Sequence, residues 1–336
     1  MHSDDLGTSY DVIVIGGGAA GLNGALMLAR SRRSVVVIDG GQPRNAPAEG
    51  VHGLLGHDGM PPAELLERGR AEVRSYGGAV VEGSVSAISG AAGGFTVHLD
   101  DGRSAVGRRL LVTTGLVDEL PVVDGLAERW GRDVIHCPYC HGWEVRDQAI
   151  GILATGSMAS HQAQLFRQLS LDVVVFTHTS ELSEHDRTRL LVRDVGIVDG
   201  EVTGLEIVDD RVGGMRLADG TVVPRDVVVV QTRMAARAGF LADLGLAPIE
   251  HPMGVGSYVP ADPTGLTAVR GVYVAGNITD LTAQVGAAAA AGALAGARIN
   301  ADLVEEETDL LVARRDATLA ISVPTTDAAQ AGVAAH

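Results

Sequence analysis

The strongest constraint on the fold is a glycine-rich turn between two short apolar runs near the N-terminus. Residues 11–15 (DVIVI) and 34–38 (SVVVI) are typical of buried parallel strands. Between them, Gly16-Gly17-Gly18-Ala19-Ala20-Gly21 opens an alanine- and leucine-rich helix to about Arg30, and the second strand ends in Asp39. This order is the fingerprint of a dinucleotide-binding βαβ unit, whose glycines let the backbone approach a pyrophosphate and whose acid accepts from ribose hydroxyls.

A second, fainter unit of the same kind follows. Residues 149–153 (AIGIL) and 172–176 (DVVVF) are typical strands around a loop that starts at Ala154 and a helix. Alternating strands at 95–99 and 213–217, each beside an Asp-Gly turn, predict a hairpin in each half. Residues 271–275 (GVYVA) predict another buried strand, before a small-residue helix from Gln284 to about Leu303. The 336 residues are therefore expected to form an α/β protein with two Rossmann-like nucleotide-binding domains.

Both cysteines of the chain lie in one motif, His136-Cys137-Pro138-Tyr139-Cys140-His141. At this spacing the sulfurs can reach each other, and flanking imidazoles with a nearby helix start would favour the thiolate, the species that exchanges disulfides. A zinc site, a static disulfide and two incidental buried thiols are the alternatives. Nothing indicates secretion and no second ligand pair is visible, so a catalytic disulfide is favoured and no metal site is expected.

Charge and composition restrict the partners. The net charge of −16 argues against nucleic acid and against an anionic membrane surface. All 26 basic residues are arginine, which excludes lysine-dependent chemistry such as a Schiff base or a P-loop. No signal peptide is visible in residues 1–10, and the apolar stretches at 11–29 and 285–297 are too rich in glycine or alanine for convincing membrane spans. We therefore expect a cytoplasmic protein.

Over roughly residues 10–303, the chain resembles the low-molecular-weight thioredoxin reductases. The glycine fingerprint with Asp39, the run Thr113-Thr114-Gly115, the C-x-x-C motif, the second loop and residues 271–276 (GVYVAG) occur in that family's order. The resemblance implies an FAD domain split into residues 1–117 and 245–320. An inserted domain of the NADPH-binding type at 118–244 carries the cysteines, and residues 321–336 are expected to be a frayed tail. The resemblance to the reductases also implies a homodimer.

The same resemblance implies the site residues. Cys137 would face the substrate, Cys140 would lie next to the flavin, and His141 would take protons from attacking thiols, a task that His136 could share. Asn277, where the family has aspartate, could hydrogen-bond the ribityl chain, and the helix start at Gln284 would point its positive end at the flavin. The residues implied to bind FAD are Gly16, Gly18, Ala20, Gly21, Asp39, Gly40, Gln42, Arg44, Asn45, Val85, Thr113, Thr114, Gly115, Gly276, Asn277, Gln284 and Val285.

Two departures concern the nicotinamide cofactor. Ala154 stands where the reductases have the first glycine of the second loop. The strand after it should lead into a His-Arg-Arg run whose guanidiniums clamp the 2′-phosphate of NADPH, but here it leads into Thr177-His178, and the next arginine is Arg187. We therefore expect that NADPH is not bound productively, the alternative being that another arginine reaches the site across the fold.

A third departure lies in the redox motif, where His141 replaces the reductases' aspartate. The form C-P-x-C-H-G-x-E, and the run Gln42-Pro43-Arg44-Asn45, resemble the FAD-dependent dithiol oxidases of natural-product biosynthesis, of the gliotoxin, romidepsin and holomycin type, with the holomycin type as the nearest match. The resemblance implies a thiol oxidase that closes a disulfide in a small dithiol such as a dithiolopyrrolone, with O2 as co-substrate and H2O2 as product. An NAD(P)H-dependent thioredoxin or disulfide reductase is the alternative, and a redox-sensing flavoprotein is a third possibility.

Overall fold

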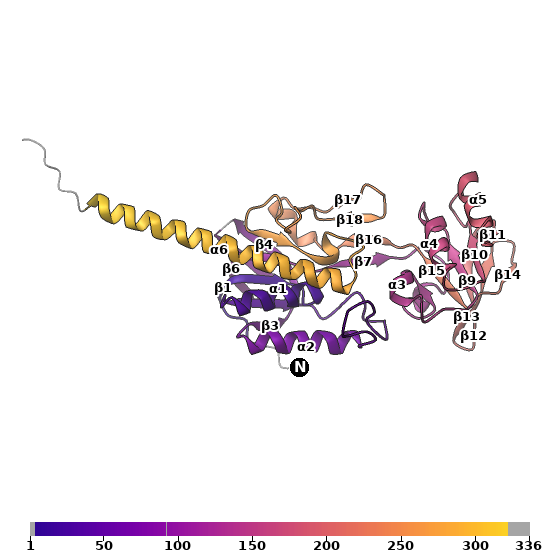
Figure 1. Ribbon diagram of the computed structural model, residues 1–336, viewed down its shortest axis with the longest axis horizontal. Coiled ribbons are helices and arrows are strands. Elements are labelled where there is room, and N and C mark those ends of the chain that lie inside the picture. The colour runs from indigo at the N-terminus through magenta and orange to yellow at the C-terminus, as the bar shows by residue number, and fades with distance from the viewer. Residues whose placement is uncertain (1–3, 92, 322–336) are drawn as a thin grey trace, which may run out of the picture.

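The first of two large sheets is built from both ends of the chain. The computed structural model describes residues 4–91 and 93–321, and in Figure 1 this sheet and its helices form the larger of two lobes. Its strand order is β3-β2-β1-β6-β5-β4, and β19 pairs with the second half of β6. Its strands are β1 (Ser9–Ile15), β2 (Val35–Asp39), β3 (Ala79–Glu82), β4 (Val85–Ala91), β5 (Gly94–Leu99), β6 (Ser104–Val112) and β19 (Val272–Val274).

Strand β1 shows how the core divides into layers. Val12 and Val14 pack with the helices α1 (Ala19–Arg30), α2 (Pro62–Ser75) and α6 (Val285–Ile321). Ile13 and Ile15 point to the opposite face and pack with residues of β4 and β5, because successive side chains of a strand alternate. The result is a three-layer ββα arrangement. Strands β5 and β6 form the predicted hairpin across the Asp-Gly turn.

Helices α1 and α6 pack closely because small residues face each other. A Cβ at Gly292 would overlap the carbonyl of Ala20, and a Cβ at Gly296 would lie 2.6 Å from the carbonyl oxygen of Gly24. The predicted start of α6 next to Gln284 is correct, but its predicted end near Leu303 is wrong. The helix continues to Ile321 because residues 304–321 contain neither proline nor glycine, and its last turns project beyond the lobe in Figure 1.

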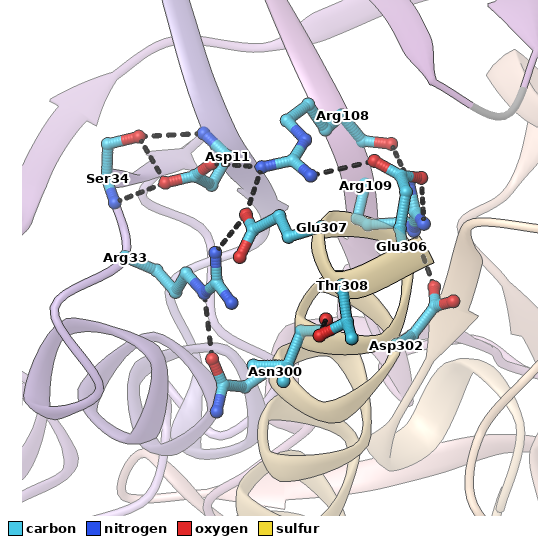
Figure 2. A network of polar contacts seen from close by, with 11 residues as sticks. Asp11, Arg33, Ser34, Arg108, Arg109, Asn300, Asp302, Glu306, Glu307 and Thr308 are labelled. Atoms are coloured by element: carbon cyan, nitrogen blue, oxygen red, sulfur yellow. Dashed lines mark hydrogen bonds and ion pairs between the residues drawn. The ribbon is translucent and has the colours of Figure 1, made fainter. Parts of the chain in front are cut away.

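A network of ion pairs holds α6 where it leaves the lobe. Arg109 has no exposed surface, and its guanidinium donates to Asp302 at 2.5 Å and to Glu306 at 2.6 Å. Its neighbour Arg108 donates to Asp11 on β1 at 2.9 Å and to Glu307 on α6 at 2.7 Å. Figure 2 shows these residues linking the helix to β1 and β6. Hydrogen bonds from both arginines lower the pKa of Glu306, so the network is charged at neutral pH.

The second sheet is entirely parallel and lies in the smaller lobe. Its strand order is β11-β10-β9-β15-β8, and the three-stranded antiparallel sheet β12-β13-β14 contains the second predicted hairpin. The helices α3 (Pro138–His141), α4 (Ala159–Phe166) and α5 (Glu184–Leu191) belong to this lobe. Its strands are β8 (Val134–Ile135), β9 (Ile150–Leu153), β10 (Val173–Phe176), β11 (Gly196–Val198), β12 (Val202–Val208), β13 (Arg211–Leu217), β14 (Val222–Val223) and β15 (Val227–Val230).

Two antiparallel strands carry the chain between the lobes. Strand β7 (Leu116–Glu119) runs outward and β16 (Arg233–Ala236) returns beside it, in a small sheet with β17 (Ile249–Glu250) and β18 (Gly256–Tyr258). The 3-10 helices are Ala127–Arg129, Gly239–Leu244 and Gly276–Ile278. The domain limits 1–117, 118–244 and 245–320 stay a prediction. All but the first residue of the expected tail at 321–336 lies outside the described residues.

Candidate active site

One large cavity lies where the carboxyl ends of parallel strands from the two large sheets meet. Its volume is about 1290 Å³. The first sheet contributes the loops after β1, β2 and β6, and the second contributes the segments after β8 and β15. Every predicted cofactor-binding residue except Gly21 lines it, together with Cys137, Cys140 and His141. Residues more than a hundred positions apart therefore share one space, at the edge where α/β sheets bind ligands.

The loop after β1 has the geometry of a phosphate cradle. Gly16 has φ +104°, and a Cβ there would lie 2.6 Å from the carbonyl oxygen of Thr113. Gly18 is the N-cap of α1 without a side-chain cap, and a Cβ at this position would have no protein atom within 4 Å. The backbone N–H groups of the first helical turn therefore face open space, as a bound pyrophosphate requires. Gly21 instead allows contact inside the fold, since a Cβ there would overlap the carbonyl of Gly16.

The predicted ribose acid lies beside this loop. Asp39 ends β2, and its carboxylate accepts from Arg70 at 3.1 Å and from the N–H of Gly41 at 3.3 Å. A Cβ at Gly17 would lie 2.6 Å from the Asp39 carboxylate, so only glycine fits between the acid and the helix start. The loop and the acid are thus adjacent in space and together fit the pyrophosphate and ribose of a dinucleotide such as FAD.

Two candidate cofactor residues have polar groups that are already occupied by the protein. Arg44 makes a two-pronged ion pair with Asp118 on β7, at 2.6 and 2.7 Å. The amide nitrogen of Asn277 donates to the carbonyls of Asp280, Leu281 and Ala283 and so holds the loop before α6. Both residues line the cavity, but these contacts give them a positioning role that the sequence did not suggest.

Cys137 and Cys140 form a disulfide at the cavity wall. Their Cα atoms are 5.3 Å apart, Cys137 is the N-cap of the single-turn helix α3, and Pro138 occupies its first position. Proline suits that position because it lacks the N–H that would have no partner there. No group of three or more His, Cys, Asp or Glu side chains that could hold a metal ion occurs among the described residues.

The two histidines beside the cysteines differ in their surroundings. Burial, with the positive charge of Arg44 second, lowers the pKa of His136 to about 4. Burial also lowers the pKa of His141, against the opposing effect of Glu144. Both imidazoles are therefore neutral at pH 7. They do not supply the positive charge expected to favour the thiolate, but a neutral imidazole can accept a proton. The Nε2 atom of His141 is buried and has no partner among the described residues.

Several residues of the site were missed by the sequence analysis. His52 reaches Glu144 at 3.4 Å and Asp58 at 3.3 Å, and Thr232 donates to Asp118 at 2.6 Å. Gln162 on α4 and Gln231 after β15 also line the cavity. Only Gln231 carried a usable signal, because it directly follows the apolar run 227–230 and the carboxyl end of a parallel strand is where ligands bind.

The second nucleotide loop lacks the features of the first. Thr155 donates its hydroxyl to the carbonyl of Gln231 at 2.9 Å, and a Cβ at Gly156 would lie 3.2 Å from the side-chain oxygen of Gln231. Arg187, the first arginine after β10, pairs with Asp199 at 2.7 Å. These two residues line a separate cavity of about 470 Å³ with Thr177, His178, Thr179, Ser180, Glu181, Leu182 and Glu184. The carboxylates of Glu181, Glu184 and Asp199 therefore share this cavity with a single arginine.

Comparison with known proteins identifies the family. The pyridine nucleotide-disulphide oxidoreductase family matches residues 10–293. The chain is 31% identical to thioredoxin reductase tcpT of Claviceps purpurea, over 88% of this chain and 95% of the other. It is 29% identical to thioredoxin reductase sirT of Leptosphaeria maculans, over 87% and 93%. The crystal structure of HlmI has 44% identity and a TM-score of 0.85, over 96% of this chain and 99% of the other.

These likenesses confirm the predicted α/β fold with two Rossmann-like units and the predicted resemblance to the thioredoxin-reductase-like enzymes of natural-product biosynthesis. Flavin binding is a property that the family implies, and the cradle after β1 fits it. None of the helices within 4–91 and 93–321 combines the length and apolarity that a membrane crossing requires. The chain belongs to the pyridine nucleotide-disulphide oxidoreductases and is an oxidoreductase of their thioredoxin-reductase-like branch.

Proposed function

We propose that this protein is an FAD-dependent thiol oxidase that closes an intramolecular disulfide in a small dithiol. The observation that carries the proposal is that the Cys137–Cys140 disulfide and the glycine cradle after β1 line one cavity. Electrons can therefore pass from a dithiol to a bound flavin without a second nucleotide. The 44% identity to HlmI supports the same branch, and a natural-product dithiol of the dithiolopyrrolone type is the proposed substrate.

The chemistry is two successive thiol–disulfide exchanges. A substrate thiolate attacks Sγ of Cys137, the Cys137–Cys140 bond breaks, and Cys140 leaves as a thiolate. The second substrate thiolate then attacks the substrate sulfur of the mixed disulfide, which releases Cys137 and the cyclic disulfide product. Two electrons and two protons have left the substrate. The loop after β1 and Asp39 would hold FAD, which would supply the two-electron acceptor for the enzyme dithiol, with molecular oxygen as the final acceptor and hydrogen peroxide as its product.

His141 is the proposed base for these thiols. It follows Cys140 directly, it lines the cavity, and its Nε2 atom is buried without a partner in the described part of the chain. Its lowered pKa keeps the imidazole unprotonated at neutral pH, so that it can accept the proton of an attacking thiol. We assign His136 no proton transfer at pH 7, because an imidazole whose pKa is about 4 is a weak base.

NADPH is not part of this proposal. The second loop has Ala154 in place of a glycine, and the guanidinium of Arg187, on α5, is paired with Asp199. Glu181 and Glu184 lie in the same cavity and would repel a 2′-phosphate. A homodimer that acts on small molecules in the cytoplasm stays our prediction from the resemblance. The thioredoxin reductase names of tcpT and sirT favour the alternative, an NAD(P)H-dependent reductase.

Anaerobic bleaching of the flavin tests the two functions against each other. The purified yellow protein is mixed with dithiothreitol in one cuvette and with NADPH in another, and the flavin absorbance is followed. We expect bleaching by the dithiol, little bleaching by NADPH, and recovery of the yellow colour with one hydrogen peroxide per flavin on admitting air. The Cys140→Ser variant should not bleach with the dithiol. Rapid bleaching by NADPH without a response to any dithiol would establish the reductase instead.

A further inference from the structure

The cavity wall contains buried polar atoms that the protein itself does not satisfy. The side-chain oxygens of Gln162 and Gln231 are buried and have no hydrogen-bond partner among the described residues. Both residues line the cavity that also contains the disulfide. A buried acceptor without a donor costs on the order of 1–3 kcal/mol, which a ligand that donates a hydrogen bond to it would recover. What they lack is a hydrogen-bond donor.

The orientation of Gln162 is set by its neighbour. Its amide nitrogen donates to the carbonyl oxygen of His136 at 2.8 Å. A carbonyl can only accept, so the nitrogen must face His136 and the side-chain oxygen must face away from it. The side chain is only 9% exposed. Gln162 is therefore a fixed acceptor, and the carbonyl that holds it belongs to the residue immediately before Cys137.

Gln231 lies near the same segment through the second sheet. It follows β15, which pairs with β8 through Val229 and Ile135, and β8 leads directly into His136 and Cys137. Both glutamines thus lie near the chain that carries the disulfide, Gln162 on α4 and Gln231 at the carboxyl end of β15. In a doubly wound fold this edge binds a nucleotide, but here it opens into the cavity of the disulfide.

We propose that Gln162, supported by Gln231, selects the substrate by accepting a hydrogen bond from an N–H group of the dithiol. The inference rests on the proposed oxidase function and adds the class of substrate, a neutral dithiol with an amide N–H near its sulfurs. A carboxylate at the same place would face two carbonyl-type oxygens and be repelled. No covalent step is added, because the hydrogen bond only positions the substrate thiolate for attack on Cys137.

Two matched dithiols test this selection. N,N′-bis(mercaptoacetyl)hydrazine carries two N–H groups, its N,N′-dimethyl analogue carries none, and dithiothreitol serves as a dithiol without an amide. Anaerobic flavin bleaching is measured with each for the wild type, Gln162→Met and Gln231→Met. Gln231→Met covers the case that Gln162→Met fails to fold, because Gln231 does not hold the His136 carbonyl. Gln164→Met is the matched control, because Gln164 lies on the same helix α4 and does not line the cavity.

We expect the ratio of bleaching rates, N–H dithiol over N-methyl dithiol, to fall about tenfold in Gln162→Met, the cost of one unmade hydrogen bond. A smaller fall is expected in Gln231→Met and none in Gln164→Met, whose rate with dithiothreitol also stays within about twofold of the wild type. An unchanged ratio in the folded glutamine variants would overturn the selection and leave the oxidase function intact. Bleaching by no dithiol at all would overturn the oxidase function itself. If NADPH bleaches the wild type but not Gln162→Met, the N–H donor is the nicotinamide carboxamide, which overturns the proposal.

Discussion

The crevice after β1 and the crevice after β9 start from the same βαβ unit but present different chemical surfaces. After β1, a Cβ at Gly18 would meet no protein atom within 4 Å, and backbone N–H groups face the cavity. After β9, Ala154 replaces the first glycine and the loop is held by Thr155 on the carbonyl of Gln231. One crevice offers backbone donors to an anion, whereas the other offers side-chain acceptors.

This difference shows that a nucleotide-binding fold can keep its strands and change the polar groups at their carboxyl edge. The parallel strands still bring Cys137, Gln162 and Gln231 to one carboxyl edge. Backbone donors suit phosphate because they need no particular side chain, while acceptors suit a neutral ligand with N–H groups. In our proposal, the first crevice binds the cofactor and the second binds the substrate, and the disulfide lies between them.

The largest expected effect comes from changing the base on the substrate side. His141→Gln keeps the size and polarity of the side chain but cannot take a proton at neutral pH. We expect the rate of flavin bleaching by a dithiol to fall about 100-fold, the usual contribution of a general base, with FAD still bound. Stopped-flow absorbance measures the rate, and protein-bound flavin is the control. A rate within about threefold of the wild type would exclude His141 as the base.

The next effect tests the cofactor crevice alone. Gly18→Asp places a carboxylate at the N-cap of α1, which suits the helix but repels a phosphate. We expect the dissociation constant of FAD to rise about 100-fold while the apoprotein stays folded. Gly156→Asp is the same change in the second loop and should leave FAD affinity within about twofold. Titration of apoprotein with FAD measures both, and full FAD affinity in Gly18→Asp would mean that the pyrophosphate binds elsewhere.

A smaller effect concerns the pH dependence of stability at the junction. The pKa of His136 is about 4 in the folded protein, with Arg44 and Asp118 as its charged neighbours, but near 6.5 in the unfolded chain. As the pH falls from 7 to 5, the unfolded chain takes up a proton that the folded protein does not, so stability is lost. His136→Gln removes this proton uptake. Between pH 7 and pH 5 the variant should therefore lose about 2 kcal/mol less unfolding free energy than the wild type loses. Urea unfolding of both proteins at pH 7 and pH 5 measures this difference. The same loss of unfolding free energy in the variant and the wild type would contradict it.

The smallest expected effect concerns the use of NADPH by the second nucleotide loop and its neighbouring cavity. Asp199→Asn releases Arg187, on α5, from its ion pair. Since both side chains are partly exposed and Glu181 and Glu184 lie in the same cavity, we expect NADPH bleaching to gain no more than about threefold. A gain of a hundredfold or more would show that a single charge, and not the whole loop, separates this protein from a reductase. Asp194→Asn, on an exposed turn, is the control.

The sequence predicted the strands around both loops because each strand is a short apolar run next to turn residues. β1, β2, β9, β10 and β19 lie within one or two residues of their predicted positions. Gly16 and Asp39, which follow predicted strands, line the cavity, and so does Cys137, which follows the unpredicted strand β8; their roles stay a prediction. The end of α6 was missed because the expected stop relied on a change in composition and not on a helix-breaking residue.

What the sequence alone determined is therefore local: the glycine turn, the alternating and apolar runs, and the C-x-x-C spacing each follow from the backbone preferences of neighbouring residues. The tertiary structure decided which side chains meet. It pairs Arg44 with Asp118 and Arg187 with Asp199, and it sets Gln162 against the carbonyl of His136. These contacts join residues far apart in the chain, and no local pattern encodes them, because only the packed sheets bring their loops to the same edge.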